Sequence, residues 1–286
     1  MGSMDRSRAA FRATLVAVVA AAGLLAGGCG TAQNYLDPRG PGFTGQHATA
    51  APPAAPGAGP GGGLRVVSFN VEHAQRIPQA IAILRAHPPL RDADVLALQE
   101  MDLPGTQAVA EALGLNYVYY PASRGPGHER DMGEAVLSPW PIEDSWKVPL
   151  PHLTNLIHRS RSAAAARILV RGRALRAYSV HFGSPWGMGA TRRREQAQAV
   201  LADALTSPEP VVIAGDFNSK GVSKVFEAAG FVWATRDIGR TAGPFSFDHV
   251  VARGLTPAGA PAAGVVREAR EASDHRPVWA SFGPVP

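Results

Sequence analysis

Residues 211–219 read Val-Val-Ile-Ala-Gly-Asp-Phe-Asn-Ser and predict a short buried strand that ends in polar groups. The four apolar residues form the strand, and Gly215 ends it in a tight turn. Asp216 and Asn218 are two residues apart, so in extended geometry both point to one face, while Phe217 points back into apolar material. A carboxylate beside an amide can hold a hard metal ion or orient a water molecule. An Asx hydrogen bond that only caps the turn is the alternative.

Further polar side chains follow other predicted strands at the points where those strands end. Residues 64–71 form a β-rich strand that carries Asn70, and residues 94–99 form a buried strand that Glu100 follows. The remaining strand ends carry His181 after residues 174–180, and Asp274 with His275 before residues 277–282. Buried strands that end in carboxylates, amides and imidazoles predict one metal and phosphate site. Oxygen ligands favour Mg²⁺ or Mn²⁺, and no His-Glu-x-x-His motif or paired cysteine supports zinc.

The distribution of elements along the chain predicts the fold class. Roughly ten strands are interleaved with roughly four helices, of which residues 191–205 form the clearest. The helices are too few for a purely parallel sheet. We therefore expect an α/β (α+β) protein in which two mixed sheets pack face to face with helices outside. The first turn of the helix at 191–205 carries Arg192, Arg193 and Arg194, a poor match to the helix dipole. A solvated face is the favoured interpretation, and an anion-facing patch is the alternative.

Composition divides the chain into three regions. Residues 1–29 have a basic start, an apolar run and the ending Leu-Ala-Gly-Gly-Cys, which resembles the lipobox of bacterial lipoproteins. We expect lipidation of Cys29, and hence an exported protein with an N-terminal lipid anchor in a membrane. An ordinary signal peptide, which would leave the protein periplasmic or extracellular, is the alternative. Residues 30–63 are rich in Pro, Gly and Ala and predict a disordered tether. Residues 64–286 form the predicted catalytic domain.

The polar strand ends fall in short motifs that follow one another along the chain. The motifs are Ser68-Phe69-Asn70, Leu98-Gln99-Glu100, Val180-His181-Phe182, Gly215-Asp216-Phe217-Asn218, Phe247-Asp248-His249 and Ser273-Asp274-His275. In this order, over residues 64–282, the sequence resembles the endonuclease/exonuclease/phosphatase superfamily. The resemblance implies a four-layer sandwich of two mixed β-sheets flanked by helices, and metal-dependent hydrolysis of phosphoesters.

The resemblance and the chemistry of each side chain together imply the roles of the site residues. Glu100 is expected to be the main metal ligand, assisted by Asn70 and Asp274. Asp216 is expected to orient or deprotonate the attacking water, and Asn218 to hold the phosphate or that water. His181 is expected to bind the phosphate or act as an acid, and Arg161 to bind the phosphate. His275 is expected to bind or protonate the phosphate, and Asp248 to fix the ring of His275. Whether Asp216 or His275 is the base stays open.

Several neighbouring residues have less specific assignments. Arg159 is nearly as good a phosphate-binding candidate as Arg161, and Glu134 is expected to orient His181. His249 follows Asp248 on a strand and so faces the opposite side, as a structural histidine. His73 lies in a loop and is expected to face solvent. Trp140, Trp146 and Trp186 lie in Pro-rich loops, where packing beneath the loop is favoured over lining a cleft.

The substrate is the least determined feature of the sequence. The formal net charge of +5 is too small to establish a nucleic-acid partner. An exported, surface-tethered phosphodiesterase or nuclease is the favoured function, with nucleic acid among the candidate substrates. A phosphomonoesterase and a lipid (sphingomyelinase-like) phosphodiesterase are the alternatives within the enzyme class. A non-catalytic binding module is disfavoured because none of the expected ligands is lost. No obligate protein partner is evident.

Overall fold

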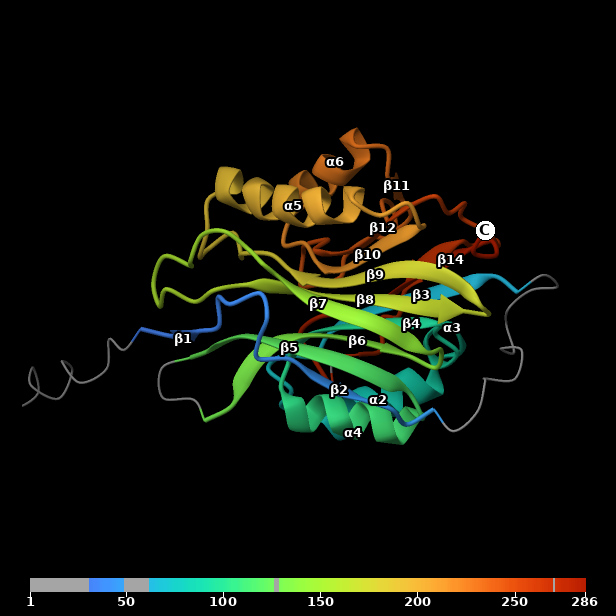
Figure 1. Ribbon diagram of the computed structural model, residues 1–286, viewed down its shortest axis with the longest axis horizontal. Helices are drawn as coiled ribbons and strands as arrows, with labels where there is room; N and C mark the ends of the chain where they lie inside the picture. The colour runs from blue at the N-terminus through green and yellow to red at the C-terminus, as the bar shows by residue number, and fades with distance from the viewer. Residues whose placement is uncertain (1–30, 49–61, 126–128, 270) are drawn as a thin grey trace, which may run out of the picture.

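The computed structural model describes residues 31–48, 62–125, 129–269 and 271–286. These residues form a four-layer sandwich in which two β-sheets lie face to face and helices cover both outer faces (Figure 1). The predicted fold class is therefore confirmed. The predicted signal peptide and Cys29 lie outside the described residues. None of the described helices is both long enough and apolar enough to cross a membrane.

The first sheet has the strand order β1-β5-β6-β4-β3-β14-β13, with β2 paired to β5. Its strands are β1 (Gln33–Asn34), β2 (Phe43–Gly45), β3 (Leu64–Asn70), β4 (Val95–Met101), β5 (Asn116–Arg124), β6 (Asp131–Ser138), β13 (Ala263–Val265) and β14 (Val278–Phe282). The second sheet has the order β11-β12-β10-β9-β8-β7. Its strands are β7 (Ile142–Pro149), β8 (Ser162–Val170), β9 (Arg173–His181), β10 (Val211–Asp216), β11 (Val232–Trp233) and β12 (Asp248–Arg253).

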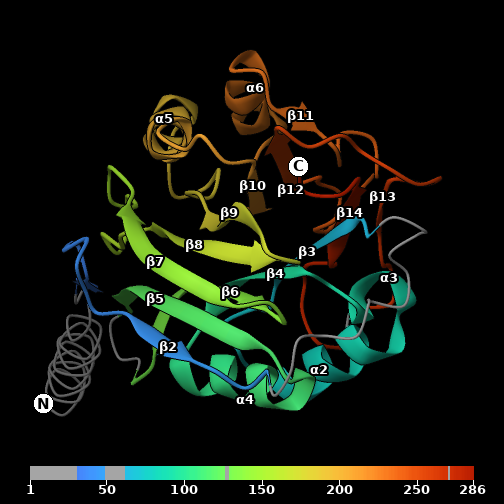
Figure 2. The same cartoon turned by 45° about the vertical axis from the view of Figure 1, so that its right-hand side comes forward.

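Each sheet has its own helical cover. The first is covered by α2 (Ile77–Ala86), α3 (Pro88–Arg91) and α4 (Leu103–Leu113), and the second by α5 (Ala190–Leu205) and α6 (Lys220–Ala228) (Figures 1 and 2). Separate apolar clusters fill the space beneath each set of helices, and a third fills the space between the sheets. The residues of both sheets are thus buried on two faces, which explains the nearly continuous apolar runs in the sequence.

Strand β10 shows how the sequence pattern produces these layers. Val212 and Ala214 belong to the cluster between the sheets, whereas Val211 and Ile213 belong to the cluster beneath α5 and α6. This alternation is the two-residue period of a strand. At Gly215 any side chain would collide with the carbonyl oxygen of Val180 on β9. Glycine is therefore required for β10 and β9 to stay paired up to the site.

Capping residues set where the two helices over the second sheet begin. Helix α6 begins at Lys220, because the hydroxyl of Ser219 accepts a hydrogen bond from the backbone N–H of Gly221 at 3.0 Å and caps the helix. The helix predicted over 191–205 begins at Ala190. Its N-cap is Gly189, which has no side chain to cap the helix.

The prediction of a disordered tether over residues 30–63 is wrong for residues 31–48. Strand β1 pairs with β5 at Arg124 and Ser123, and β2 pairs with β5 at residues 117–119. The ammonium group of Lys147, which is 2% exposed, donates to the carbonyl oxygens of Tyr35 at 3.0 Å and Gly40 at 2.7 Å. These long-range partners cover the edge of β5 and cannot be foreseen from local composition. Residues 49–61 of the predicted tether lie outside the described part of the chain.

Candidate active site

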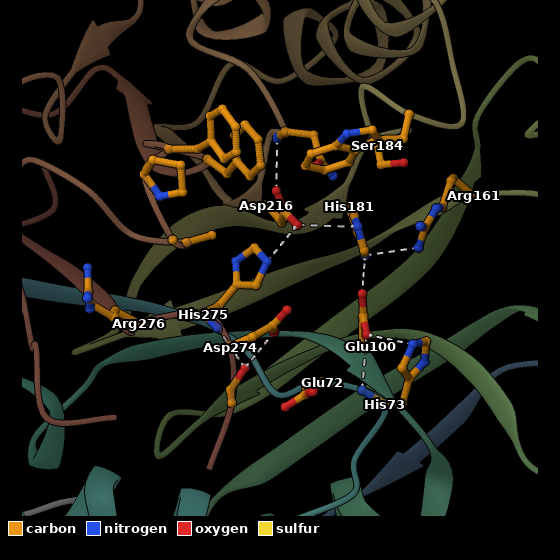
Figure 3. Close-up of a pocket in the computed structure, with 18 of the residues that line it drawn as sticks. Glu72, His73, Glu100, Arg161, His181, Ser184, Asp216, Asp274, His275 and Arg276 are labelled. Carbon is orange, nitrogen blue, oxygen red and sulfur yellow. Dashed lines mark hydrogen bonds and ion pairs between the residues drawn. The ribbon is translucent and has the colours of Figure 1, made fainter. Parts of the chain in front are cut away.

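A pocket opens at one end of the two sheets, where their strands deliver polar side chains (Figure 3). Its lining includes Glu72, His73, Arg76, Glu100, Arg159, Arg161, His181, Ser184, Trp186, Asp216, Asn218, Phe245, Phe247, Asp274, His275 and Arg276. The first sheet supplies Glu100 from β4, and the second supplies His181 and Asp216 from the ends of β9 and β10. The predicted convergence of strand ends is thus present.

Asp216 lies at the centre of this pocket and is 2% exposed. The register pairs it with His181 on parallel β9 and with Asp248 on antiparallel β12. Its Oδ2 atom lies 3.2 Å from Asn70 Nδ2 and 3.3 Å from His181 Nε2. Burial raises the pKa of Asp216 to about 7, a rise that Asp248 and Glu100 increase and His275 opposes. A carboxylate of this pKa can accept a proton at neutral pH.

Asn218 takes part in the Asx hydrogen bond that the alternative interpretation of residues 211–219 required. Its backbone N–H donates to Asp216 Oδ1 at 2.8 Å, and its backbone has a positive φ of 52°, which asparagine tolerates. Its side-chain Nδ2 donates to the carbonyl oxygen of Phe182 at 3.0 Å. Asn218 nevertheless lines the pocket, so the cap and a position at the site occur together.

His275 is held by Asp248 as predicted. Nδ1 of the ring lies 2.9 Å from Asp248 Oδ2 and 3.1 Å from Oδ1, and its Nε2 lies 3.7 Å from Asp216 Oδ2. Burial lowers the pKa of His275, but the carboxylates of Asp248 and Asp216 outweigh burial and raise the pKa to about 10. The ring is therefore protonated at neutral pH, with Nδ1–H donating to Asp248 and Nε2–H turned towards Asp216.

The hydrogen bond to Nδ1 of His181 shows that the ring is neutral and which nitrogen carries the proton. Nη1 of Arg161 lies 3.0 Å from His181 Nδ1, and since a guanidinium only donates, Nδ1 accepts. The proton then sits on Nε2, which lies 3.3 Å from Asp216 Oδ2. Burial lowers the pKa of His181, and the charge of Arg161 lowers it further. Of the two roles expected for His181, this state fits hydrogen bonding to the base or to a phosphate and disfavours the role of acid.

Glu100 is turned into the pocket by an irregularity in β4. The register between β4 and β6 shifts between Leu98 and Met101, and Glu100 has a positive φ of 58°, which is strained for this residue type. Its carboxylate accepts a hydrogen bond from the backbone N–H of His73 at 3.0 Å and lies 3.4 Å from Asn70 Nδ2. The predicted neighbours Glu100 and Asn70 are thus in contact.

Asp274 and His275 are presented by a short turn that Ser273 ties to the first sheet. The hydroxyl of Ser273 donates to the carbonyl oxygen of Asn70 at 2.7 Å and accepts from the backbone N–H of His275 at 3.1 Å. Asp274 is exposed at the pocket, on the side of Glu100 and Glu72 (Figure 3). The turn therefore separates a carboxylate at the pocket mouth from an imidazole at its floor.

Two groups of side chains in the pocket are candidate cation ligands. Asp216, Asp248 and His275 each place one ligand atom within 4.8 Å of the others. In this group the ring of His275 already faces both carboxylates, with Nδ1 2.9 Å from Asp248 Oδ2 and Nε2 3.7 Å from Asp216 Oδ2. Glu100 and Asp274 instead bring carboxylates to the solvent-facing side of the pocket, beside the amide of Asn70. This set of oxygen donors fits a hard divalent cation.

Several pocket residues were missed by the sequence analysis. His73, expected to face solvent, lies 3.4 Å from Glu100 through its Nε2 atom. It belongs to a turn in which Glu72, His73 and Ala74 all have positive φ. The position of this turn, directly after Asn70, was the available signal, because residues that follow a strand end stay near its sheet edge. Trp186 was expected to pack beneath a loop, but it is 71% exposed and lines the pocket.

Two other assignments have opposite outcomes. The prediction that Glu134 orients His181 is wrong: Glu134 is fully buried and accepts a hydrogen bond from the hydroxyl of Ser162 at 3.1 Å, whereas Arg161 contacts His181. His249 is buried on the opposite face, as predicted, and accepts a hydrogen bond from Trp233 Nε1 at 3.2 Å. Arg159 lines the pocket together with Arg161.

Comparison with known proteins agrees with this arrangement. The model of the Endonuclease/Exonuclease/phosphatase family matches residues 67–275. Similar solved structures include an endonuclease/exonuclease/phosphatase from Bacteroides vulgatus, with 16% identity over 78% of this chain and 99% of that chain and a TM-score of 0.62. D. rerio TDP2, solved in complex with a single-strand DNA product, has 18% identity over 78% and 99% of the two chains and a TM-score of 0.58. The mannosyl-6-phosphatase Bt3783 of Bacteroides thetaiotaomicron has 18% identity over 77% and 99% and a TM-score of 0.54.

The comparison with curated proteins gives no match. At identities of 16–18% the structural likeness shows the fold alone. The family match, however, spans most of the catalytic domain, from β3 to the turn that carries His275. Since the motifs within that span also meet in one pocket, the chain belongs to the endonuclease/exonuclease/phosphatase family.

Proposed function

We propose that the protein is a phosphodiesterase that depends on Mg²⁺ or Mn²⁺ and cleaves phosphodiesters of the nucleic-acid type. The observation that supports this proposal most directly is the division of charge across the pocket. Glu100 and Asp274 bring carboxylates to one side, and Arg161 and protonated His275 bring positive charge to the other. A phosphate held between a cation at the carboxylates and these two donors would have its negative charge neutralised on both sides.

Asp216 is the base in this proposal. Its raised pKa of about 7 lets it accept a proton from water, and its Oδ2 atom is positioned by Asn70 and His181. His275 has a pKa of about 10 and so cannot serve as a base at neutral pH. It instead donates a hydrogen bond, while Asp248 keeps its ring in one orientation. These protonation states favour Asp216 over His275 as the base.

Glu100 would hold the metal ion, with Asn70 and Asp274 beside it. When bound, such an ion supplies a Lewis acid that polarises a phosphoryl oxygen and neutralises charge on the leaving group. The residues of the second sheet then act on the same phosphate. Arg161 and Arg159 line the pocket as its binding cations, and Asn218 lines it beside the base.

Hydrolysis of a panel of substrates tests this proposal. The panel comprises bis-p-nitrophenyl phosphate, a dinucleotide, p-nitrophenyl phosphate and sphingomyelin, each with Mg²⁺, with Mn²⁺ and with a chelator. We expect turnover of the diesters that stops in chelator. A preference for the monoester would favour the phosphomonoesterase alternative, and a preference for sphingomyelin would favour the lipid alternative. No turnover of any phosphoester would refute the proposal.

Export and lipid anchoring form a separate part of the proposal. The support is the basic start, apolar run and Leu-Ala-Gly-Gly-Cys ending of residues 1–29. We expect the full chain to be recovered with membranes, and the Cys29→Ser variant to be recovered in the soluble fraction. If the wild-type protein is recovered in the soluble fraction with residues 1–28 already cleaved off by the cell, lipidation is refuted and export still stands.

A further inference from the structure

A second pocket lies beside the candidate active site and shares part of its wall. Trp186, Asn218, Pro244, Phe245 and Phe247 line both. We call Trp186, Phe245 and Phe247 the aromatic ridge, because these rings stand between the two pockets. The rings of Phe245 and Phe247 are parallel at 4.8 Å, and Trp186 meets them edge to face at 5.9 and 6.2 Å. Trp186 and Phe245 are 71% and 43% exposed, so the ridge offers apolar surface to a ligand.

The second pocket is basic. Arg193, Lys220 and Arg240 line it, and no carboxylate occurs among its described lining residues. Lys220 lies in the first turn of α6, and its ammonium group donates to the carbonyl oxygen of Arg236 at 3.2 Å. The N-cap residue of α6, Ser219, also lines the pocket. The positive end of the helix dipole therefore adds to the charge of the cations. We call this site, defined by Arg193, Lys220 and Arg240, the basic pocket.

Arg193 gives the second, independent indication of an anionic ligand. The residue is 9% exposed, and its Nε and Nη1 atoms are buried without a hydrogen-bond partner in the part of the chain that the structure describes. Its neighbours Arg192 and Arg194 are exposed, as expected for a solvated helix face. Of this run of arginines, only Arg193 has the burial that the anion-facing alternative requires, and it lines the basic pocket. Burying a guanidinium without acceptors is costly, and an anion in the basic pocket that Arg193 lines would offset the cost of its buried charge.

We propose that the basic pocket binds a second phosphate of the substrate, so that the preferred substrate is a nucleic-acid strand whose base lies on the aromatic ridge between two phosphates. This inference rests on the proposed function, because it places the scissile phosphate in the candidate active site. Along a single strand of nucleic acid, a base with its flat ring lies between each phosphate and the next. An acyl chain on the ridge would leave the cations of the basic pocket without a counter-charge, so a lipid fits less well.

The test isolates the second phosphate from the scissile one. The dinucleotide TpT carries a single phosphodiester, and pTpT and TpTp add one terminal phosphate at either end. We expect one of the two additions to raise kcat/KM by about 10-fold or more, the effect of a charge-assisted hydrogen bond. Lys220→Ala and Arg240→Ala should each remove most of this gain and leave the rate on TpT unchanged. Arg193→Gln should do the same if a thermal melt shows it to be folded.

Lys224→Ala and Arg194→Ala are the matched controls. Both residues are exposed, lie on the same helices as Lys220 and Arg193, and do not line the basic pocket. Neither change should alter the gain. The proposal is overturned if neither terminal phosphate changes kcat/KM, or if Lys220→Ala and Lys224→Ala act alike. Binding to phosphatidylserine vesicles that Lys220→Ala abolishes, with no effect on pTpT or TpTp, would assign the pocket to a lipid and overturn it too.

Calorimetric binding of the same nucleotides to the Asp216→Asn variant repeats the comparison without catalysis. Tighter binding of pTpT or TpTp than of TpT, lost in the Lys220→Ala background, supports the basic pocket even if hydrolysis fails. Equal binding of all three nucleotides by Asp216→Asn, when the wild type hydrolyses TpT, refutes the basic pocket and leaves the proposed function standing.

Discussion

The Asp248→Asn substitution should show how much the positive charge of the His275 ring contributes to turnover, apart from the position of the ring. Asp248 is fully buried, and its carboxylate raises the pKa of His275 to about 10 together with that of Asp216. The amide keeps the shape of the side chain but removes the charge, so the pKa of His275 should fall towards its ordinary value of about 6.5. The charged fraction of the ring would then be about one quarter at pH 7 and about one hundredth at pH 8.5. In the wild type nearly all rings are charged at both pH values.

The expected loss therefore grows with pH. Charge alone lowers turnover by about 4-fold at pH 7 and by about 100-fold at pH 8.5. Loss of the fixed ring orientation brings the total at pH 7 to about 10- to 10⁴-fold. The assay is hydrolysis of bis-p-nitrophenyl phosphate from pH 6.5 to 9, with the exposed Asp237→Asn as control. A folded Asp248→Asn protein with wild-type turnover, or with a loss independent of pH, would refute the role given to His275.

Three further predictions concern the metal, the N-terminal strands and a buried histidine. Glu100→Gln should raise the Mg²⁺ concentration needed for half-maximal hydrolysis by about 10-fold or more. If the dialysed wild-type protein keeps full activity in chelator, the metal site is contradicted. Deleting residues 31–48 should lower the free energy of unfolding by about 3 kcal/mol or more in a urea titration, because buried Lys147 loses two carbonyl acceptors. Lys147→Met should recover part of that loss, and equal stability with and without the segment would contradict the contact. Burial lowers the pKa of His249 to about 4, so the unfolded chain binds the His249 proton first as pH falls. The contribution of His249 to stability should therefore drop by about 2 kcal/mol from pH 7.5 to 5, measured as the difference between the wild type and His249→Asn. The same pH dependence of stability in both proteins would contradict this.

The residues at strand ends could be predicted from the sequence because their geometry is local. A buried apolar run fixes a strand, and the two-residue period then fixes the face of each side chain. Asp216, Asn218 and His181 were placed in this way, and the contact between Asp248 and His275 was predicted. The four-layer arrangement followed from the ordered motifs and from the small number of helices.

The remaining site residues depend on loop conformations and long-range contacts that no local pattern encodes. His73 reaches Glu100 through consecutive residues with positive φ, a backbone shape that its sequence does not announce. Trp186 and Phe245 meet from loops far apart in the chain. Strands β1 and β2 were missed for a related reason. Their pairing with β5 depends on partners more than seventy residues away, and their own composition resembles a linker.

The central claim is that Asp216 activates water against a phosphoester held in this pocket. The most direct measurement is single-turnover hydrolysis of TpT with Mg²⁺ at pH 8 by the wild type and by Asp216→Asn, at equal protein concentration and with equal thermal stability. We expect the variant to be slower by about 10²-fold or more, the loss typical of a general base. A folded Asp216→Asn protein that hydrolyses TpT at the wild-type rate would contradict the claim.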